Sequence, residues 1–120
     1  REGVLRFQDK KLELLFVTLD KADAVHEGVA YNDYAISREK FHWQSQNMAS
    51  PNTPTGRRYI ESNTNGWQFQ LFVRENKQSA YKACGPVTFI SSHGERPMNV
   101  TWKLGSKLPT RLYQSFNILR

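Results

Sequence analysis

Two tyrosines and a carboxylate lie close together in the segment Tyr31-Asn32-Asp33-Tyr34. A tyrosine ring can stack on a nucleobase, and an aspartate can accept a hydrogen bond from the amino group of cytosine. We therefore predict a base pocket formed by Tyr31, Asp33, Tyr34 and Trp43. The alternative is that these aromatic residues belong to the core and only bring their hydroxyls to the surface, and alternation along its own segment favours the core for Trp43.

The segment Phe41 to Gln46, FHWQSQ, alternates between apolar and polar side chains. This pattern predicts a half-buried strand with a polar face. Amide side chains donate and accept hydrogen bonds at once, which suits the edges of bases in a groove. The side chains predicted to contact base edges are His42, Gln44, Ser45 and Gln46.

Basic residues predominate in the second part of the chain, whose formal net charge is +6 in total. Residues 1–35 hold five basic and seven acidic side chains, whereas residues 36–120 hold twelve basic and four acidic ones. Such an excess is typical of proteins that contact phosphate backbones or anionic surfaces. Arg57 and Arg58 follow a polar loop, and guanidinium groups can grip phosphates while such a loop enters a groove. The predicted phosphate contacts are Arg38, Arg57, Arg58, Arg74 and Lys82.

The sequence contains no GxSxG, P-loop, HExxH or EF-hand pattern. Asp33, His42 and His93 could be assembled into a hydrolytic site, but their spacing does not require one. Cys84 is the one cysteine, and its small and apolar neighbours favour a packed thiol. No Cys/His cluster has the spacing of a zinc site. We therefore expect a binding domain with no catalytic residue, metal or cofactor.

Several segments have the pattern of β-strands. Leu12 to Leu19 is apolar on both alternating faces, which indicates a central strand. Trp67 to Glu75 is predicted to turn Phe69, Leu71 and Val73 inward. The residues predicted to face outward are Gln68, Gln70, Phe72 and Arg74. Gly85-Pro86 is expected to open a strand over Val87 to Ser91, which would pair as a hairpin with Met98 to Leu104.

The predicted helices are short. Thr55 is expected to cap one that runs through Ser62, and a strong turn signal follows at Asn65-Gly66. Another is possible around Ala22 to His26. After Pro109 the apolar residues recur at helical spacing, which indicates a short closing helix.

This pattern predicts a mainly β chain with α+β character, either a small curled antiparallel sheet or a barrel like those of SRA and PUA domains, with short helices. Residues 1–120 fit a single domain, and the missing initial methionine suggests a fragment of a larger protein. The longest apolar run, Leu14 to Val17, is too short for a membrane helix. With no signal peptide either, we expect a cytoplasmic domain outside the membrane.

Four stretches of the chain resemble an uncharacterised domain of bacterial DNA-processing proteins. They are TLDK (Thr18 to Lys21), YNDYAISREKFHWQSQN (Tyr31 to Asn47), FVRE (Phe72 to Glu75) and GPVTFISSHGERPMNVTWKLGSKLP (Gly85 to Pro109). The resemblance spans roughly residues 12–116. In those proteins the domain lies C-terminal to a phospholipase-D-type nuclease domain and a DEAD/DEAH-type helicase motor. SauUSI-like, modification-dependent type IV restriction enzymes have this layout.

The resemblance implies a target-recognition domain that distinguishes duplex DNA carrying 5-methyl- or 5-hydroxymethylcytosine from unmodified DNA, with base flipping as the expected mode. Binding would license the nuclease and helicase domains of the same chain, and this domain itself would not cut. Two other hypotheses stay open. One is a modification-independent DNA-binding or docking module that couples nuclease and helicase. The other is a small hydrolase that uses Asp33, His42 and His93.

Overall fold

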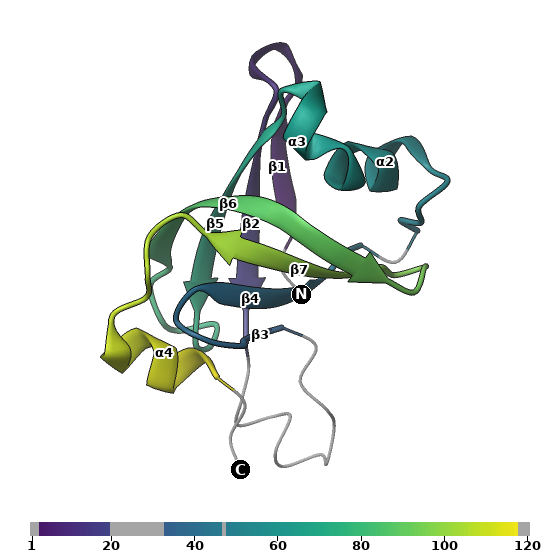
Figure 1. Ribbon diagram of the computed structural model, residues 1–120. Coiled ribbons are helices and arrows are strands. Elements are labelled where there is room, and N and C mark those ends of the chain that lie inside the picture. The colour runs from purple at the N-terminus through teal and green to yellow at the C-terminus, as the bar shows by residue number, and fades with distance from the viewer. Residues whose placement is uncertain (1–2, 20–32, 47, 118–120) are drawn as a thin grey trace.

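A mixed β-sheet forms the framework of the domain (Figure 1). The structure, a computed structural model, describes residues 3–19, 33–46 and 48–117. In these ranges seven strands follow the order β1-β2-β5-β6-β7-β4-β3. The strands are β1 (Val4–Phe7), β2 (Leu12–Thr18), β3 (Tyr34–Ala35), β4 (Lys40–Gln44), β5 (Gln68–Arg74), β6 (Lys82–His93) and β7 (Asn99–Leu104). The helical elements are η1 (Gln8–Lys10), α2 (Pro54–Ile60), α3 (Ser62–Asn65) and α4 (Thr110–Phe116).

The prediction of a mainly β fold with short helices is confirmed, with one difference in the pairing of strands. Strands β2 and β5 pair parallel, whereas the other neighbouring strands described pair antiparallel. A parallel pair needs a long crossover connection, and here it contains β3, β4, α2 and α3. The order ends at β1 and β3, which do not pair with each other among the described residues. An open, curled sheet therefore describes the fold better than a closed barrel.

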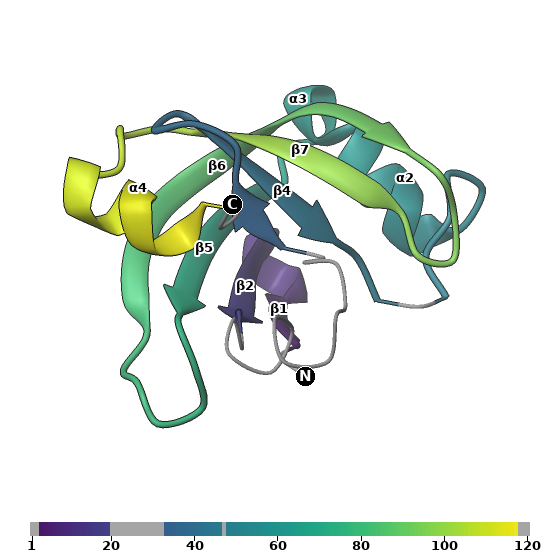
Figure 2. The same ribbon diagram turned by 90° about the horizontal axis from the view of Figure 1, so that it is seen from below.

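The curl of the sheet comes largely from β6, which is twelve residues long. It pairs with β5 near its start and with β7 further along, and the register shifts once in each ladder. Figures 1 and 2 show the result, with β7 and β4 crossing β1 and β2 at a large angle. The predicted start of this strand at Gly85-Pro86 is wrong. Gly85 has a φ of 85° at the first irregularity and the strand continues through it, as glycine in a bulge permits.

One face of the sheet carries the apolar core. Alternate residues of the inner strands are fully or almost fully buried, which confirms the alternation predicted for Trp67 to Glu75 and for Met98 to Leu104. Tyr59 of α2 and Phe116 of α4 are also buried. The large side chains of this core include Leu15, Val17, Phe41, Trp43, Phe69, Leu71, Val73, Val100 and Trp102. Burial of each such side chain stabilises the fold by about 1.5–3 kcal/mol.

Helix α2 begins two residues earlier than the predicted cap at Thr55 would place it. The N-cap is Thr53, whose Oγ1 accepts a hydrogen bond from the backbone N–H of Gly56 at 3.1 Å. Pro54 suits the first helical position because it has no N–H to leave unpaired. Gly56 lets the helix pack on the preceding loop, since a Cβ there would lie 1.8 Å from the carbonyl oxygen of Ser50.

The other two helix predictions and the turn prediction have different outcomes. The closing helix expected after Pro109 is present as α4, with Phe116 buried. The possible helix at Ala22 to His26 lies outside the described residues. The turn predicted at Asn65-Gly66 is confirmed, because Gly66 ends α3 with a φ of 85°.

Candidate nucleic-acid interface

Strands β4, β7 and β6 turn alternate side chains away from the core, and we call this side of the sheet the outer face. The strand register arranges its side chains in three rows that run across the strands. The first row contains Lys40, Lys103 and Thr88, the second Tyr34, His42, Thr101 and Ser91, and the third Gln44, Asn99 and His93. Sequence positions up to 69 residues apart, from Tyr34 to Lys103, therefore form one polar surface with aromatic members.

The second row contains a stack between Tyr34 and His42. Their ring centroids lie 4.7 Å apart with an interplanar angle of 17°. His93 extends this group from the third row, because its ring centroid lies 6.4 Å from that of His42. Tyr34 and His42 are half-buried, whereas His93 is exposed. The outer face thus combines flat rings with imidazole N–H donors.

Hydrogen bonds of two amide side chains fix the positions of residues in the third row. Gln44 Nε2 donates to Asn99 Oδ1 at 3.3 Å, and Asn99 Nδ2 donates to the carbonyl oxygen of His93 at 3.4 Å. The first bond links side chains of β4 and β7, and the second links the Asn99 side chain of β7 to the backbone of β6. The amides can contribute donors and acceptors to a ligand on the same surface.

Four basic side chains gather at one end of the outer face, and we call Arg38, Lys40, Lys103 and Lys107 the cationic edge. Lys40 and Lys103 are directly opposite each other in the register, and both are exposed. Like charges directly opposite each other destabilise a sheet, so a bound anion would relieve this pair.

One carboxylate, Glu39, lies within this edge. Its Oε2 is 3.9 Å from Lys107 Nζ, with both side chains more than half exposed, so the pair contributes little to stability. Arg38 Nε donates to the carbonyl oxygen of Leu108 at 2.7 Å, and the backbone N–H of Leu108 donates back to the carbonyl oxygen of Arg38 at 2.8 Å. These bonds fix the chain before β4 against the chain after β7.

The structure brings some of the predicted base-pocket residues together and separates others. Asp33 and Tyr34 lie at the edge strand β3, and Tyr34 belongs to the outer face. Asp33 is only 7% exposed, and its Oδ1 accepts a hydrogen bond from the backbone N–H of Gln44 at 2.7 Å. Tyr31 lies outside the described residues.

The prediction that Trp43 lines the base pocket is wrong. Trp43 is 2% exposed and lies in the core, where its ring centroid is 5.3 Å from that of Tyr59 in an edge-to-face contact. Alternation along β4 is the reason, since Trp43 points to the opposite side of the sheet from His42 and Gln44.

The prediction that Ser45 contacts a base edge also fails. Ser45 is 1% exposed, and its Oγ accepts from the backbone N–H of Met98 at 2.8 Å and donates to the carbonyl oxygen of Gln46 at 3.1 Å. The hydroxyl therefore stabilises the segment after β4. Gln46 itself is exposed next to the third row, so its assignment stays a prediction.

Arg58 is not placed to bind a phosphate. Its side chain is 12% exposed, and its Nε lies 3.1 Å from Oε1 of Glu13, which is completely buried on β2. The hydroxyl of Tyr59 donates to the other oxygen of Glu13 at 2.8 Å. The guanidinium also lies 5.0 Å from the ring centroid of Trp67. These contacts make Arg58 an internal partner, and we call Glu13, Arg58 and Tyr59 the buried network.

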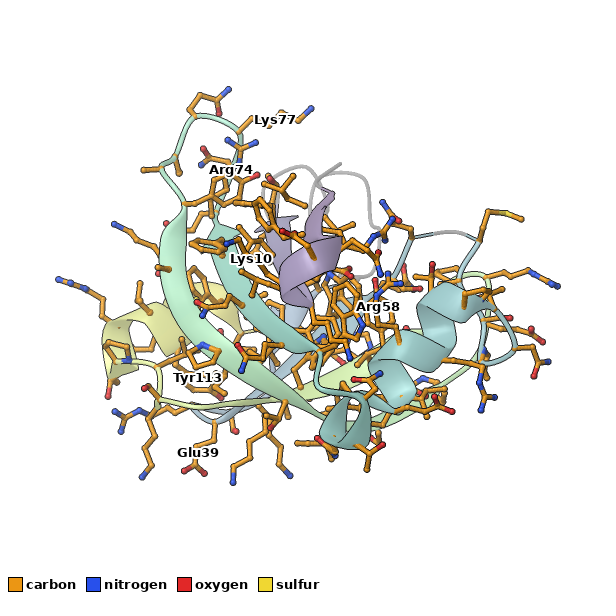
Figure 3. The ribbon with its side chains drawn as sticks, turned by 90° about the horizontal axis from the view of Figure 1, so that it is seen from above. Lys10, Glu39, Arg58, Arg74, Lys77 and Tyr113 are labelled. Atoms are coloured by element: carbon orange, nitrogen blue, oxygen red, sulfur yellow. The ribbon has the colours of Figure 1, made fainter. Side chains whose placement is uncertain are left out.

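The other predicted phosphate contacts occupy separate parts of the surface. Arg57 is exposed and pairs with Glu61 one helical turn away. Arg74 lies 4.4 Å from the ring centroid of Tyr81 and donates through Nε to Thr18 Oγ1 at 2.8 Å. Lys82 is exposed at the start of β6. Figure 3 shows Arg74 and Lys77 at one end of the molecule and Glu39 of the cationic edge at the other.

Sequence reasoning missed Lys40, Lys103, Lys107 and His93 as members of one surface. Alternation alone could have placed each of them on the solvent side of its strand. It could not show that β4 pairs with β7 rather than with the strand that follows it, and that pairing is what brings the lysines together.

Among the described residues, no group of three or more His, Cys, Asp or Glu is arranged to hold a metal ion. None of the helices in the described ranges is long and apolar enough to cross a membrane. Burial raises the pKa of the Cys84 thiol to about 11, so it is a weak nucleophile at neutral pH.

No curated protein sequence matches the chain. A family model described as "Domain of unknown function (DUF3427)" matches residues 1–116, which is nearly the whole sequence. The chain therefore belongs to the DUF3427 family.

Proposed function

We propose that this domain binds duplex DNA through the outer face and the cationic edge, and that it reads a modified cytosine for nuclease and helicase domains of the same protein. The observation that carries the DNA-binding part is the position of Lys40 directly opposite Lys103, one row from the stack of Tyr34 on His42. Paired cations supply phosphate contacts, and adjacent rings supply stacking for bases, which is the combination found in nucleic-acid sites.

The reading of a modified cytosine rests on the resemblance to modification-dependent restriction enzymes and on the chemistry of Tyr34. A methyl group buried against an aromatic ring contributes about 0.8 kcal/mol, which is a preference of only a few-fold. Flipping a base costs a few kcal/mol, which phosphate contacts must offset. Binding should therefore be strongly salt-dependent, with a smaller difference between modified and plain duplexes.

The test is a titration of the chain with matched duplexes that carry cytosine, 5-methylcytosine or 5-hydroxymethylcytosine, at several salt concentrations. The double variant Lys40→Gln, Lys103→Gln should bind every duplex roughly tenfold more weakly near 0.1 M salt, and its plot of log affinity against log salt should be shallower by about 2. Lys77→Gln removes one charge at the opposite end of the molecule and serves as the control. Equal losses in the two variants would contradict the assignment of the interface.

One observation favours a second candidate function, modification-independent DNA binding. Asp33 is almost fully buried and already accepts a hydrogen bond from the backbone N–H of Gln44, so this carboxylate is not presented to a cytosine amino group. If the three duplexes bind equally while the lysine variant still weakens all of them, the domain couples DNA to its neighbouring domains without reading a base modification.

A further inference from the structure

Met48 is 74% exposed, which is the largest exposure of any large apolar side chain in the part of the chain that the structure describes. Leu5 on β1 comes next at 48%. Met48 lies between β4 and α2, past the end of the outer face that carries the third row. A single exposed apolar residue is common on protein surfaces. What distinguishes Met48 is the way in which the chain on both sides of it is held.

The residues that flank Met48 are fixed to the core. Ser45 and Ala49, three residues before it and one residue after it, are both buried. The backbone N–H of Ser45 donates to the carbonyl oxygen of Met98 at 2.9 Å, and the backbone N–H of Met98 donates to Ser45 Oγ at 2.8 Å. Met48 is therefore an exposed apolar side chain on a short segment that is anchored at both ends.

The loop between β6 and β7 supports the same segment. The backbone N–H of Arg96 donates to the carbonyl oxygen of Ala49 at 2.8 Å, and Figures 1 and 2 show this loop beside the chain that leads into α2. Arg96 is exposed and has a φ of 51°, a left-handed conformation that is costly for residues other than glycine. The bond to Ala49 helps to hold this conformation. Met48 and Arg96 are thus neighbours across two loops, and we call them the loop tip.

We propose that Met48 inserts into the base stack of the bound duplex, where it occupies the space that a flipped base leaves, and that Arg96 contacts a phosphate beside it. The inference deepens the proposed function and rests on it. It adds the loop tip to the DNA-binding residues, and it gives the domain a side chain that keeps an opened base step from closing.

The chemistry of Met48 suits this position. Proteins that kink or open DNA insert apolar side chains between base steps, and methionine is one of the residues they use. Its unbranched thioether chain adapts to an irregular gap, and contact with bases removes its apolar surface from water. Because the flanking chain is already anchored, little further ordering is needed when the DNA binds.

The position of the loop tip relative to the cationic edge also suits a duplex. Lys40 and Gln44 are the two ends of β4, about 13 Å apart along the strand, and Arg96 lies past the Gln44 end. The major groove is about 12 Å wide, so cations at the two ends of the outer face can contact both strands of one duplex. Glu95 offsets the charge of Arg96, so the loop tip contributes mainly through the apolar contact of Met48.

The first test compares the affinities of wild type and variants for one duplex over a series of salt concentrations. Met48→Ala should bind roughly fivefold more weakly at every salt concentration, because it removes an apolar contact and no charge. Its plot of log affinity against log salt should keep the slope of wild type, whereas Arg96→Gln should make the slope shallower by about 1. Met48→Leu keeps an apolar side chain and should retain most of the affinity. Leu5→Ala is the matched control, since it shortens an exposed apolar side chain on β1, and its affinity should equal that of wild type.

The second test detects insertion directly. The fluorescent base 2-aminopurine, whose emission rises when it loses its stacking, is placed next to the central cytosine of the duplex that the domain binds most tightly. Saturation with wild type should raise the emission several-fold, and saturation with Met48→Ala should raise it less than half as much. Urea unfolding of each variant shows that the chain stays folded, as expected for exposed positions.

Three results would decide against the inference. Wild-type affinity in Met48→Ala, or no rise in emission with wild type, overturns it while DNA binding itself stands. A loss of affinity in Met48→Ala with an unchanged rise in emission places Met48 on the outside of the duplex and overturns insertion. A wild-type chain that binds no duplex at any salt concentration overturns the proposed function as well.

Discussion

The buried network and the cationic edge contain the same kinds of side chain and use them in opposite ways. In the buried network the charge of Arg58 is matched by Glu13, which is completely buried and also accepts from Tyr59. At the cationic edge, Lys40 faces Lys103 across two strands, and both remain exposed. A buried cation requires its internal counter-charge for the fold to stay stable, whereas exposed cations that face each other leave their charge for a ligand.

The difference arises from which side of the sheet each residue occupies. Glu13 follows the alternation of β2 and points to the core side with Leu15 and Val17. A carboxylate there would be costly without a partner, and α2 supplies both a guanidinium and a phenol. Lys40 and Lys103 occupy the other side of β4 and β7, where water solvates them.

The largest effect is expected when the buried network is broken. Glu13→Gln keeps the volume of the side chain but leaves Arg58 without a counter-charge in a site that is only 12% exposed. The free energy of unfolding should fall by about 3 kcal/mol, and the melting temperature by roughly 10 °C. Urea unfolding of the two proteins measures this change. Glu61→Gln, which breaks only an exposed pair, should change stability by less than about 1 kcal/mol.

A double substitution sharpens this result. Glu13→Leu combined with Arg58→Met removes both charges, and it should recover much of the stability that Glu13→Gln loses, because uncharged side chains of similar volume avoid the cost of burying ions. If the double variant is no more stable than Glu13→Gln, packing rather than the uncompensated charge causes the loss.

Alkaline pH acts on the same network without a substitution. Burial, followed by the charge of Glu13, raises the pKa of Tyr59 above its ordinary value of 10.0. Above about pH 10 the unfolded chain loses this phenolic proton while the folded chain keeps it, so stability falls as the pH rises, by up to about 1.4 kcal/mol per pH unit. Burial likewise raises the pKa of Cys84 to about 11, which adds a loss of stability between its ordinary pKa of 9.0 and that value.

Unfolding measured from pH 8 to pH 11 in wild type, Cys84→Ala and Tyr59→Phe separates these two contributions. The variant Tyr59→Phe should show the smaller decline above pH 10, although it starts from a lower stability because Glu13 loses a hydrogen-bond donor. An unchanged decline in Tyr59→Phe would mean that another group controls alkaline unfolding.

Local pattern explains how much of the fold could be predicted. Alternation in Trp67 to Glu75 and in Met98 to Leu104 identifies both strands and their buried faces, because side chains of a strand alternate whatever its partners are. The parallel pairing of β2 with β5 was not predictable, since it depends on a crossover of nearly fifty residues. The sequence pattern predicts a strand boundary at Gly85, because a glycine in a bulge and a glycine in a turn have the same local signal.

The candidate site was less predictable than the fold. His42 and Gln44 were placed on a polar strand face correctly, because alternation decides that assignment. Trp43 was assigned to the pocket by its chemistry against the same alternation, and the structure places it in the core. Arg57 and Arg58 are neighbours in the sequence, yet their helix directs one to water and the other to Glu13, which is 45 residues away.

On the exposed side, selectivity for modified cytosine should depend on Tyr34 more than on Asp33. Tyr34→Ala removes a ring of the outer face and should reduce the ratio of affinities for methylated and plain duplexes by a few-fold, about 1 kcal/mol. Asp33→Asn keeps an acceptor oxygen for the backbone N–H of Gln44, so it tests the charge of Asp33 with the strand end intact. The ratio of affinities for methylated and plain duplexes should be the same in Asp33→Asn as in wild type. If Asp33→Asn alone lowers this ratio, Asp33 belongs to the base pocket, as the sequence predicted.

The smallest effect is expected at Arg57. Because it is the sequence neighbour of Arg58 but is exposed, it gives the closest comparison between a buried arginine and an exposed one. Its side chain is 58% exposed and its ion pair with Glu61 is solvated. Arg57→Gln should therefore change the free energy of unfolding by less than about 0.5 kcal/mol. It also lies on α2, away from the three rows of the outer face, so duplex affinity should fall less than twofold in the same titration that tests Lys40 and Lys103. A loss comparable to that of the lysine variant would extend the DNA interface onto α2, as the sequence first suggested.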